Sequence, residues 1–273
     1  MFFPFRDENP TRRPAIVNWT LIAVNFLALV WMTLLDSPAE QALVFDRGFI
    51  PVRISQLADR RPLLINAPQV AQHPQLPILV RDDRTYRFEP VPAQIVASMF
   101  TSMFLHAGWM HLLSNMWFLW LFGNNVEDRL GHVVYLVFYL LGGLAALACH
   151  WLTNPASPVP VIGASGAVAA VLGAYAITFP FAQIRTLVFL FIFVTIVDLP
   201  ALLVLGVWFL GQLLEARAAL HLNVDGGVAF AAHVGGFIAG LILMPLAGGT
   251  RVPPDEVGHR VIDVDSYESP WPP

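Results

Sequence analysis

The sequence predicts an all-α fold, a polytopic membrane helical bundle with six transmembrane helices. Of its 273 residues, 56% are apolar and only 12% are charged, about half the charged share of an ordinary soluble domain. The mean hydropathy is +0.63, and long stretches carry no charge, as is typical of chains that cross a membrane several times. This composition excludes a disordered protein, and the sequence has no polybasic face that would bind nucleic acid.

The first transmembrane helix is predicted over residues 14–35, which carry no charge. The stretch from Ala15 to Leu35 is about 31 Å long at roughly 1.5 Å per residue, enough to span a bilayer. A secretory signal would have a shorter apolar core and a small-residue cleavage site. The preceding leader, residues 1–13, carries Arg12 and Arg13, so the positive-inside rule places the N-terminus in the cytoplasm.

Residues 36–92 are predicted to form an extracytoplasmic loop. They are rich in arginine, aspartate and proline, and charged side chains are costly inside a bilayer. The pattern from Leu76 to Phe88 indicates a β-hairpin with its turn at Arg81–Arg84. The sequence assigns this loop no role.

Residues 93–249 are predicted to carry five further spans, because charges are sparse there and prolines mark a turn between the third and fourth spans. The polar residues 124–129 would connect the second span to the third. The five spans are expected near Ala107–Gly123, Val133–Leu152, Ala164–Phe179, Leu199–Leu214 and Gly226–Gly249. Residues 250–273, which are proline-rich and charged, are expected to be a flexible cytoplasmic tail.

The segment before the fifth span contains a single acidic residue, Asp198, followed by Pro200. We expect Asp198 to cap the start of the fifth helix, with the proline in the first turn. Residues 186–197 would then form an interfacial or re-entrant piece. The alternative is an intramembrane carboxylate on an ion or proton path.

The motif Gly163-Ala164-Ser165-Gly166 places a serine at the start of a predicted helix, between glycines that let a substrate approach closely. The free N–H groups and the dipole at a helix N-terminus suit an oxyanion. The structural alternative is a serine cap on a helix that packs through Gly166, Ala170 and Ala174, small residues four positions apart. The motif alone leaves both interpretations open.

A histidine, His233, is predicted near the outer end of the last span, above a face formed by Gly236-x-x-x-Gly240. A histidine inside a membrane is costly without a partner. Small residues let two helices approach closely, so His233 can meet Ser165. A histidine is the usual general base for a serine nucleophile, which makes acyl transfer the chemistry that this pair predicts.

His111 and Asn115 are four residues apart, so they share one face of the second span. Both side chains are donors that could stabilise the oxygen that becomes negative when a serine attacks a carbonyl. Two alternatives stay open. One is a polar pair that joins helices, and the other is a metal site with His106 and His233, although no carboxylate or His-Glu-x-x-His spacing accompanies them.

The same spacing recurs in His150 and Asn154 at the outer end of the third span, so spacing alone is a weak signal. No serine or glycine-rich partner accompanies the second pair. We therefore interpret His150 as an interface histidine and Asn154 as a turn residue.

Together, in this order along the chain, the motifs resemble those of the rhomboid intramembrane serine proteases of the bacterial, six-span type, over roughly Phe100 to Met244. The resemblance implies a serine endopeptidase with Ser165 as nucleophile and His233 as general base. It further implies that His111, Asn115 and the Ser165 backbone N–H stabilise the oxyanion. The supporting residues that it implies are His106, Gly163, Gly166, Gly236 and Gly240, and it assigns Glu127 and Arg129 a structural role.

The resemblance also implies the partners: single-span membrane proteins, cleaved near the extracytoplasmic face and admitted past the fifth span, and the surrounding lipids. It implies no metal and no cofactor. The Trp-Arg motif that many relatives carry in the first loop is absent, and that loop is long, so no gate residues can be assigned. The oligomeric state and the natural substrate stay open.

Two other function classes are weighed against a protease. A non-catalytic rhomboid-like protein that binds transmembrane helices would keep the fold but lose the serine or the histidine, and both are present here. A channel or transporter would need polar residues through both leaflets, whereas those here gather in the outer half. The expected location is a bacterial plasma membrane, with both termini in the cytoplasm.

Overall fold

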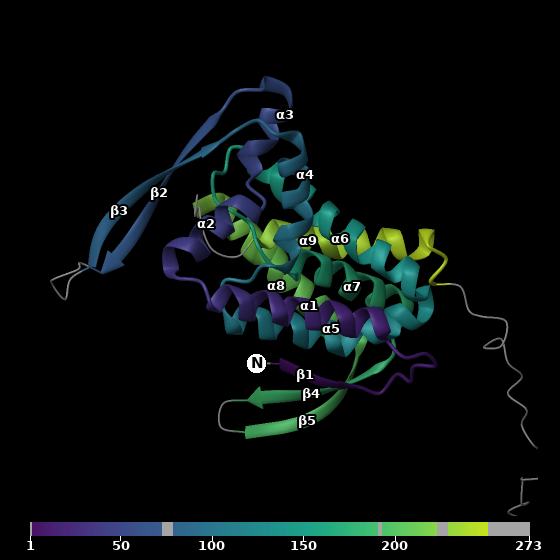
Figure 1. Ribbon diagram of the computed structural model, residues 1–273. Coiled ribbons are helices and arrows are strands. Elements are labelled where there is room, and N and C mark those ends of the chain that lie inside the picture. The colour runs from purple at the N-terminus through teal and green to yellow at the C-terminus, as the bar shows by residue number, and fades with distance from the viewer. Residues whose placement is uncertain (1, 73–78, 191–192, 223–228, 251–273) are drawn as a thin grey trace, which may run out of the picture.

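The computed structural model describes residues 2–72, 79–190, 193–222 and 229–250 (Figure 1). Within these residues, long helices lie side by side in a bundle, and one lies at each of the positions where the sequence predicts a span. These helices are α1 (Ile16–Thr33), α5 (Trp109–Leu130), α6 (His132–Thr153), α7 (Ser165–Thr178), α8 (Ala201–Leu222) and α9 (Phe230–Leu246). The predicted helical bundle is confirmed.

Three helices in the described part of the chain are long and apolar enough to cross a membrane: Ile16–Thr33, His132–Thr153 and the Ala201–Ala218 stretch of α8. Helices α7 and α9 are apolar but shorter. Helix α5 has 22 residues and carries charged side chains in its last turns. The protein is therefore a helical membrane protein, and the number of six crossings stays a prediction.

Helix α7 lies at the centre of the bundle, where every residue from Ala167 to Ala176 is buried. It contacts α5, α6, α8 and α9. A Cβ atom built on Gly236 of α9 would lie 2.2 Å from the carbonyl oxygen of Gly166, and one built on Gly240 would lie 1.9 Å from that of Ala170. Glycine is therefore needed at both positions for α9 to approach α7. This contact joins the two helices that carry Ser165 and His233.

We expect Gly240→Ala to destabilise the bundle by roughly 1–3 kcal/mol or more, because the new Cβ would overlap backbone that cannot move without separating the helices. Thermal unfolding in detergent measures the effect. Gly206→Ala on α8 is the matched control, since no described atom lies within 4 Å of that Cβ position and alanine favours a helix over glycine. Equal stability of the two variants would contradict the close approach of α7 and α9.

The polar residues 124–129 form the last turns of α5, so their interpretation as a connection is wrong. Glu127 is buried, and its carboxylate accepts hydrogen bonds from the backbone N–H groups of Val17 (2.9 Å) and Asn18 (2.7 Å). These N–H groups are at the start of α1, where they lack a partner within the helix. Glu127 can therefore be buried within α5, because its carboxylate caps the start of α1. This contact is a structural role, as expected for Glu127.

The described residues of the predicted loop, 36–72 and 79–92, fold as a small layer at one end of the bundle (Figure 1). Its elements are α2 (Ser37–Arg47), a 3₁₀ turn (Pro51–Ser55), α3 (Gln56–Asp59), β2 (Leu63–Gln72) and β3 (Leu79–Phe88), and α4 (Pro92–Thr101) follows with a 3₁₀ turn (Ser102–Phe104). The prediction of a hairpin within Leu76–Phe88 with its turn at Arg81–Arg84 is wrong, because Leu79–Phe88 are the single strand β3, in which Arg81–Arg84 lie opposite Ala67–Val70 of β2. Residues 76–78 lie outside the described residues. The hairpin of the structure pairs β3 with β2. The hairpin of β2 and β3 projects away from the bundle (Figure 1).

This outer layer is tied to the segment that leads into α7. Phe45, Ile50, Ile65 and Phe88 form part of a small apolar core in the layer. The backbone of Phe49 pairs with that of Val161 through two hydrogen bonds of 3.0 and 2.7 Å. The loop before Ser165 is therefore attached to this layer through the backbone of Phe49.

A three-stranded sheet, with strand order β1-β4-β5, adds to the predicted helical fold. It consists of β1 (Phe2–Asp7), β4 (Gln183–Leu190) and β5 (Phe193–Pro200), and it lies along the α5 side of the bundle (Figure 1). The segment 186–197 was expected to be interfacial or re-entrant, but its described residues, 186–190 and 193–197, lie in the paired strands β4 and β5. Asp198 does not cap α8, which begins at Ala201, because its carboxylate pairs with the guanidinium of Arg185 across the hairpin at 3.1 Å.

Asp7 fastens β1 to the bundle. Its carboxylate accepts hydrogen bonds from the Asn125 side-chain amide (2.7 Å) and the Tyr175 hydroxyl (2.8 Å). Three residues earlier in β1, the carbonyl oxygen of Pro4 accepts a hydrogen bond from the Trp117 indole N–H at 2.9 Å. Burial disfavours the charged carboxylate and raises the pKa of Asp7 to about 6.

This pKa predicts a pH-dependent stability. Because the folded chain holds the Asp7 proton more tightly than the unfolded chain, the contribution of Asp7 lowers stability as the pH rises from about 4 to 6, and then levels off. We define the effect of Asp7→Asn as the unfolding temperature of the variant minus that of the unmodified chain. We expect this difference to be a few degrees more positive at pH 7 than at pH 4. Thermal scans at one fixed rate measure this, with the exposed Asp59→Asn as control. Parallel pH curves for Asp7→Asn and the unmodified chain would contradict it.

Candidate active site

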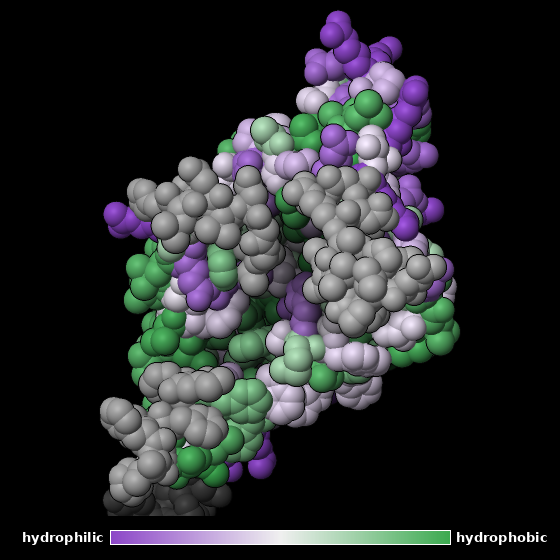
Figure 2. Space-filling view, turned by 90° about the vertical axis from the view of Figure 1, so that its left-hand side faces the viewer, coloured by the Kyte–Doolittle hydropathy of each residue, from purple (hydrophilic) through white to green (hydrophobic). Residues whose placement is uncertain are grey.

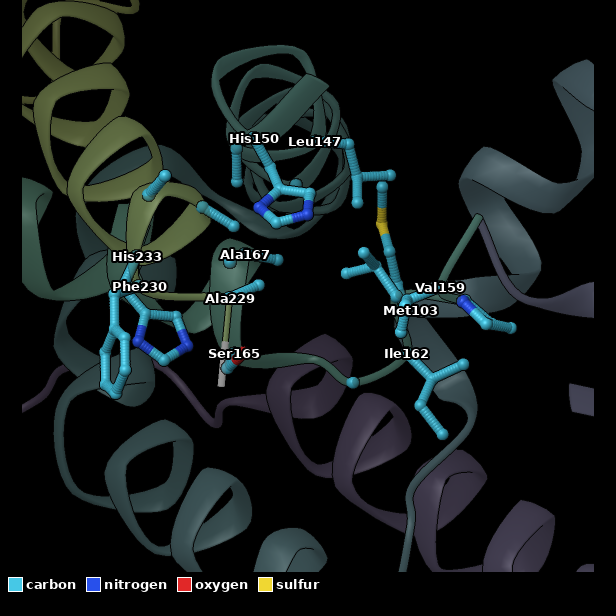
Figure 3. Close-up of a pocket in the computed structure, with 18 of the residues that line it drawn as sticks. Met103, Leu147, His150, Val159, Ile162, Ser165, Ala167, Ala229, Phe230 and His233 are labelled. Atoms are coloured by element: carbon cyan, nitrogen blue, oxygen red, sulfur yellow. The ribbon is translucent and has the colours of Figure 1, made fainter. Parts of the chain in front are cut away.

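A cavity of about 1030 Å³ opens among α5, α6, α7 and α9 and the loop before α7. Figure 2 views the molecule from the left-hand side of Figure 1 and shows a hollow in which hydrophilic residues lie among hydrophobic ones. Ser165, His233, His111 and Asn115 all line the cavity. Figure 3 shows Ser165 and His233 facing it from two different helices.

Ser165 is the first residue of α7, as predicted, and Ala164 rather than the serine is the N-cap. Its backbone N–H therefore has no carbonyl partner within the helix. Gly163 has a φ of 125°, a left-handed conformation that favours glycine. The buried His106 ring accepts a hydrogen bond from the Ala164 backbone N–H at 3.4 Å through Nε2, so it holds the turn that presents the serine.

His111 and Asn115 lie beside this turn. A Cβ built on Gly163 would lie 2.8 Å from His111 Nε2 and 3.8 Å from Asn115 Nδ2. His111 Nδ1 accepts a hydrogen bond from the Ala107 backbone N–H at 3.5 Å, so a neutral His111 ring carries its hydrogen on Nε2. Asn115 Nδ2 is buried and has no hydrogen-bond partner among the described residues. Two side-chain donors thus lie next to the turn that ends at Ser165.

His233 lies three residues after the start of α9, about one turn from that end of the helix. Its Nδ1 is hydrogen-bonded to Oε1 of Gln212 on α8. Within the described residues no hydrogen bond joins Ser165 Oγ to the ring. Such contacts are often long in a free enzyme and tighten when the substrate binds.

Comparison with known proteins settles the family. Residues 93–249, more than half of the chain, match the family model described as the Rhomboid domain. The chain belongs to the rhomboid family. The matched residues contain every candidate site residue named above, and they begin where the outer layer ends.

Three of the proteins to which the rhomboid chain is similar have names that place them in organelles. It is 33% identical over 151 residues to "Rhomboid protein 1, mitochondrial" of Saccharomyces cerevisiae, covering 53% of this chain and 40% of that protein. It is 31% identical over 149 residues to "Presenilin-associated rhomboid-like protein A, mitochondrial" of Danio rerio, covering 52% and 35%. A stretch of 68 residues is 46% identical to "Rhomboid-like protein 11, chloroplastic" of Arabidopsis thaliana, covering 25% and 24%. The match thus spans less than half of each relative, and these names do not support a bacterial plasma membrane.

Two polar residues near the rhomboid dyad candidates were not predicted as site residues. His150 of α6 lines the cavity (Figure 3), although we interpreted it as an interface histidine. Gln212 contacts His233, and its sequence signal was a lone amide in the otherwise apolar first half of α8. Among the described residues, no three His, Cys, Asp or Glu side chains lie close enough together to hold a metal ion.

Proposed function

We propose that this rhomboid protein is an intramembrane serine endopeptidase that cleaves single-span membrane proteins with the dyad Ser165 and His233. One observation carries the proposal: the serine at the start of α7 and the histidine on α9 line one cavity. Close packing between these helices, which requires Gly236 and Gly240, supports it. Polar side chains in the cavity wall, among them His111, Asn115 and Ser114, suit hydrolysis, because water must reach the reacting groups.

In the proposed reaction, Ser165 Oγ attacks the carbonyl carbon of the scissile peptide bond while His233 accepts the hydroxyl proton on Nε2. The tetrahedral intermediate carries a negative oxygen. It collapses as the peptide C–N bond breaks, and His233 gives the proton to the leaving amine. Water, deprotonated by the same ring, then attacks the acyl-enzyme ester and releases Ser165.

The oxyanion is stabilised by donors from two elements. His111 Nε2–H and Asn115 Nδ2–H come from α5, and the Ser165 backbone N–H comes from α7. The unpartnered amide of Asn115 supports this assignment, because a buried donor without a partner is costly in a resting structure. A substrate oxygen would satisfy it.

We further propose that both termini lie in the cytoplasm and that cleavage takes place near the opposite face of a bacterial plasma membrane. The arginines at positions 12 and 13 before α1 support this orientation. Single-span substrates and membrane lipids would then contact the extracytoplasmic end of the bundle. Accessibility of single cysteines placed in the leader and in β2 to an impermeant reagent measures the orientation.

Fluorophosphonate labelling of the detergent-solubilised protein, with mass-spectrometric mapping, tests the proposed function. Ser114 and Ser157 line the same cavity and serve as internal controls. We expect the label on Ser165 only, since activation requires the histidine. Label spread over all three serines would reject an activated Ser165. A folded protein that neither labels nor cleaves a model single-span substrate would favour the non-catalytic, helix-binding alternative.

A further inference from the structure

The contact between Gln212 and His233 gives the histidine a defined protonation pattern. A side-chain amide oxygen can only accept, so His233 Nδ1 must donate to Gln212 Oε1. A neutral imidazole carries one hydrogen. His233 Nε2 is therefore left with its lone pair, the form that a general base needs.

The position of Gln212 in α8 is unusual for a helix with a mostly exposed surface. Its neighbours Leu210, Leu213 and Leu214 are exposed apolar side chains, whereas Gln212 is half-buried and points to the bundle. An amide in an apolar helix is retained where it finds a polar partner on another helix. Here that partner is the histidine of the proposed dyad.

Two aromatic rings lie beside the imidazole that makes this hydrogen bond. Trp208, one turn before Gln212 on α8, has its ring centroid 6.2 Å from that of His233. Phe230 of α9 contacts the histidine edge-on, with centroids 6.3 Å apart. The ring is thus fixed by α8 on one side and by its own helix on the other.

We propose that Gln212 is a positioning residue of the dyad: by accepting the Nδ1 hydrogen of His233 it keeps Nε2 unprotonated and directed at the cavity that Ser165 lines. The proposal rests on the proposed function. Gln212 does not touch the substrate and exchanges no proton. It acts through His233, so its loss should slow the chemical step and leave substrate binding unchanged.

Three variants test this role, with cleavage of a model single-span substrate in detergent as the assay. Gln212→Met keeps the length and apolar bulk but removes the acceptor, and we expect kcat to fall roughly 10- to 100-fold, with KM within about twofold. Gln212→Glu keeps an acceptor oxygen at the same position and should restore kcat to within a few-fold. Leu213→Met, the matched control on the exposed side of α8, should leave both constants unchanged.

The fluorophosphonate labelling rate constant of Ser165 provides a second readout, because it is measured per folded molecule and does not depend on how much protein survives. It should fall with kcat in Gln212→Met and recover in Gln212→Glu. If Gln212→Met labels and cleaves like the unmodified chain, or if Gln212→Glu is no better than Gln212→Met, the positioning role is wrong. An unmodified chain that neither labels nor cleaves would instead overturn the proposed function as well.

Discussion

Replacing His233 by alanine is expected to lower the rate of substrate cleavage by about 10⁴-fold or more, and replacing Ser165 by alanine should do the same. The serine hydroxyl is a weak nucleophile until a base removes its proton, so each residue is ineffective without the other. The double variant should therefore lose no more than either single variant. Steady-state kinetics on a model single-span substrate in detergent measure all three.

The control for His233→Ala is His150→Ala, which removes a second imidazole from the wall of the same cavity. His150 comes from α6 and is not part of the proposed dyad, and its Nδ1 has no hydrogen-bond partner among the described residues. We expect its loss to cost less than about tenfold in kcat. Equal losses for the two histidine variants would reject His233 as the unique base, and additive losses for Ser165 and His233 would reject their action as a unit.

The fold was predictable from the sequence as far as hydrophobic periodicity and charge alone determine it. Uncharged runs of helical length located all the long helices, because each must bury or expose one continuous apolar surface. The boundary of α5 was misjudged, because Glu127 looked like a loop residue until its partners at the start of α1 were known. The partner of a charge is a tertiary property that the local pattern does not contain.

The sheet of β1, β4 and β5 was missed for a related reason. Strands β4 and β5 are mostly apolar and lie between α7 and α8, and a short apolar run can be read as part of a helix or as a buried strand. Asp198 looked like a cap, whereas its actual partner is Arg185, on the other strand of the hairpin. Strand β1 pairs with β4, whose residues are far from β1 in the chain. A local sequence pattern does not contain information about such a pairing.

The candidate site was predictable where function needs a recognisable motif. Ser165, His233, His111 and Asn115 all lie around one cavity, and their spacing and glycine neighbours were the signals. Gln212 and His150 carry no such motif, and only the packing of α8 and α6 on the cavity reveals them. Polar residues that reach the cavity without belonging to a motif are therefore the ones that sequence reasoning misses.

Removal of the donor at Asn115 is expected to give the second-largest loss of activity. Asn115→Ala should lower kcat by about 10²- to 10³-fold, roughly 3 kcal/mol, with little change in KM, because the donor stabilises charge that develops only in the transition state. Asn115→Asp keeps the shape but replaces the donor with a negative acceptor, so its loss should be at least as large. Ser114→Ala, the neighbouring position whose hydroxyl donates to the His111 carbonyl at 3.0 Å, is the control and should keep full activity.

The competing interpretation of Asn115, a polar residue that joins helices, predicts a different result. A joining residue stabilises the fold through a hydrogen bond, so its removal should lower the unfolding temperature. The Asn115 amide N–H has no such bond among the described residues, and we therefore expect Asn115→Ala to unfold at the temperature of the unmodified chain. A variant that loses stability but, once folded, cleaves at the normal rate would assign Asn115 to packing. Loss of kcat at unchanged stability would assign it to the oxyanion.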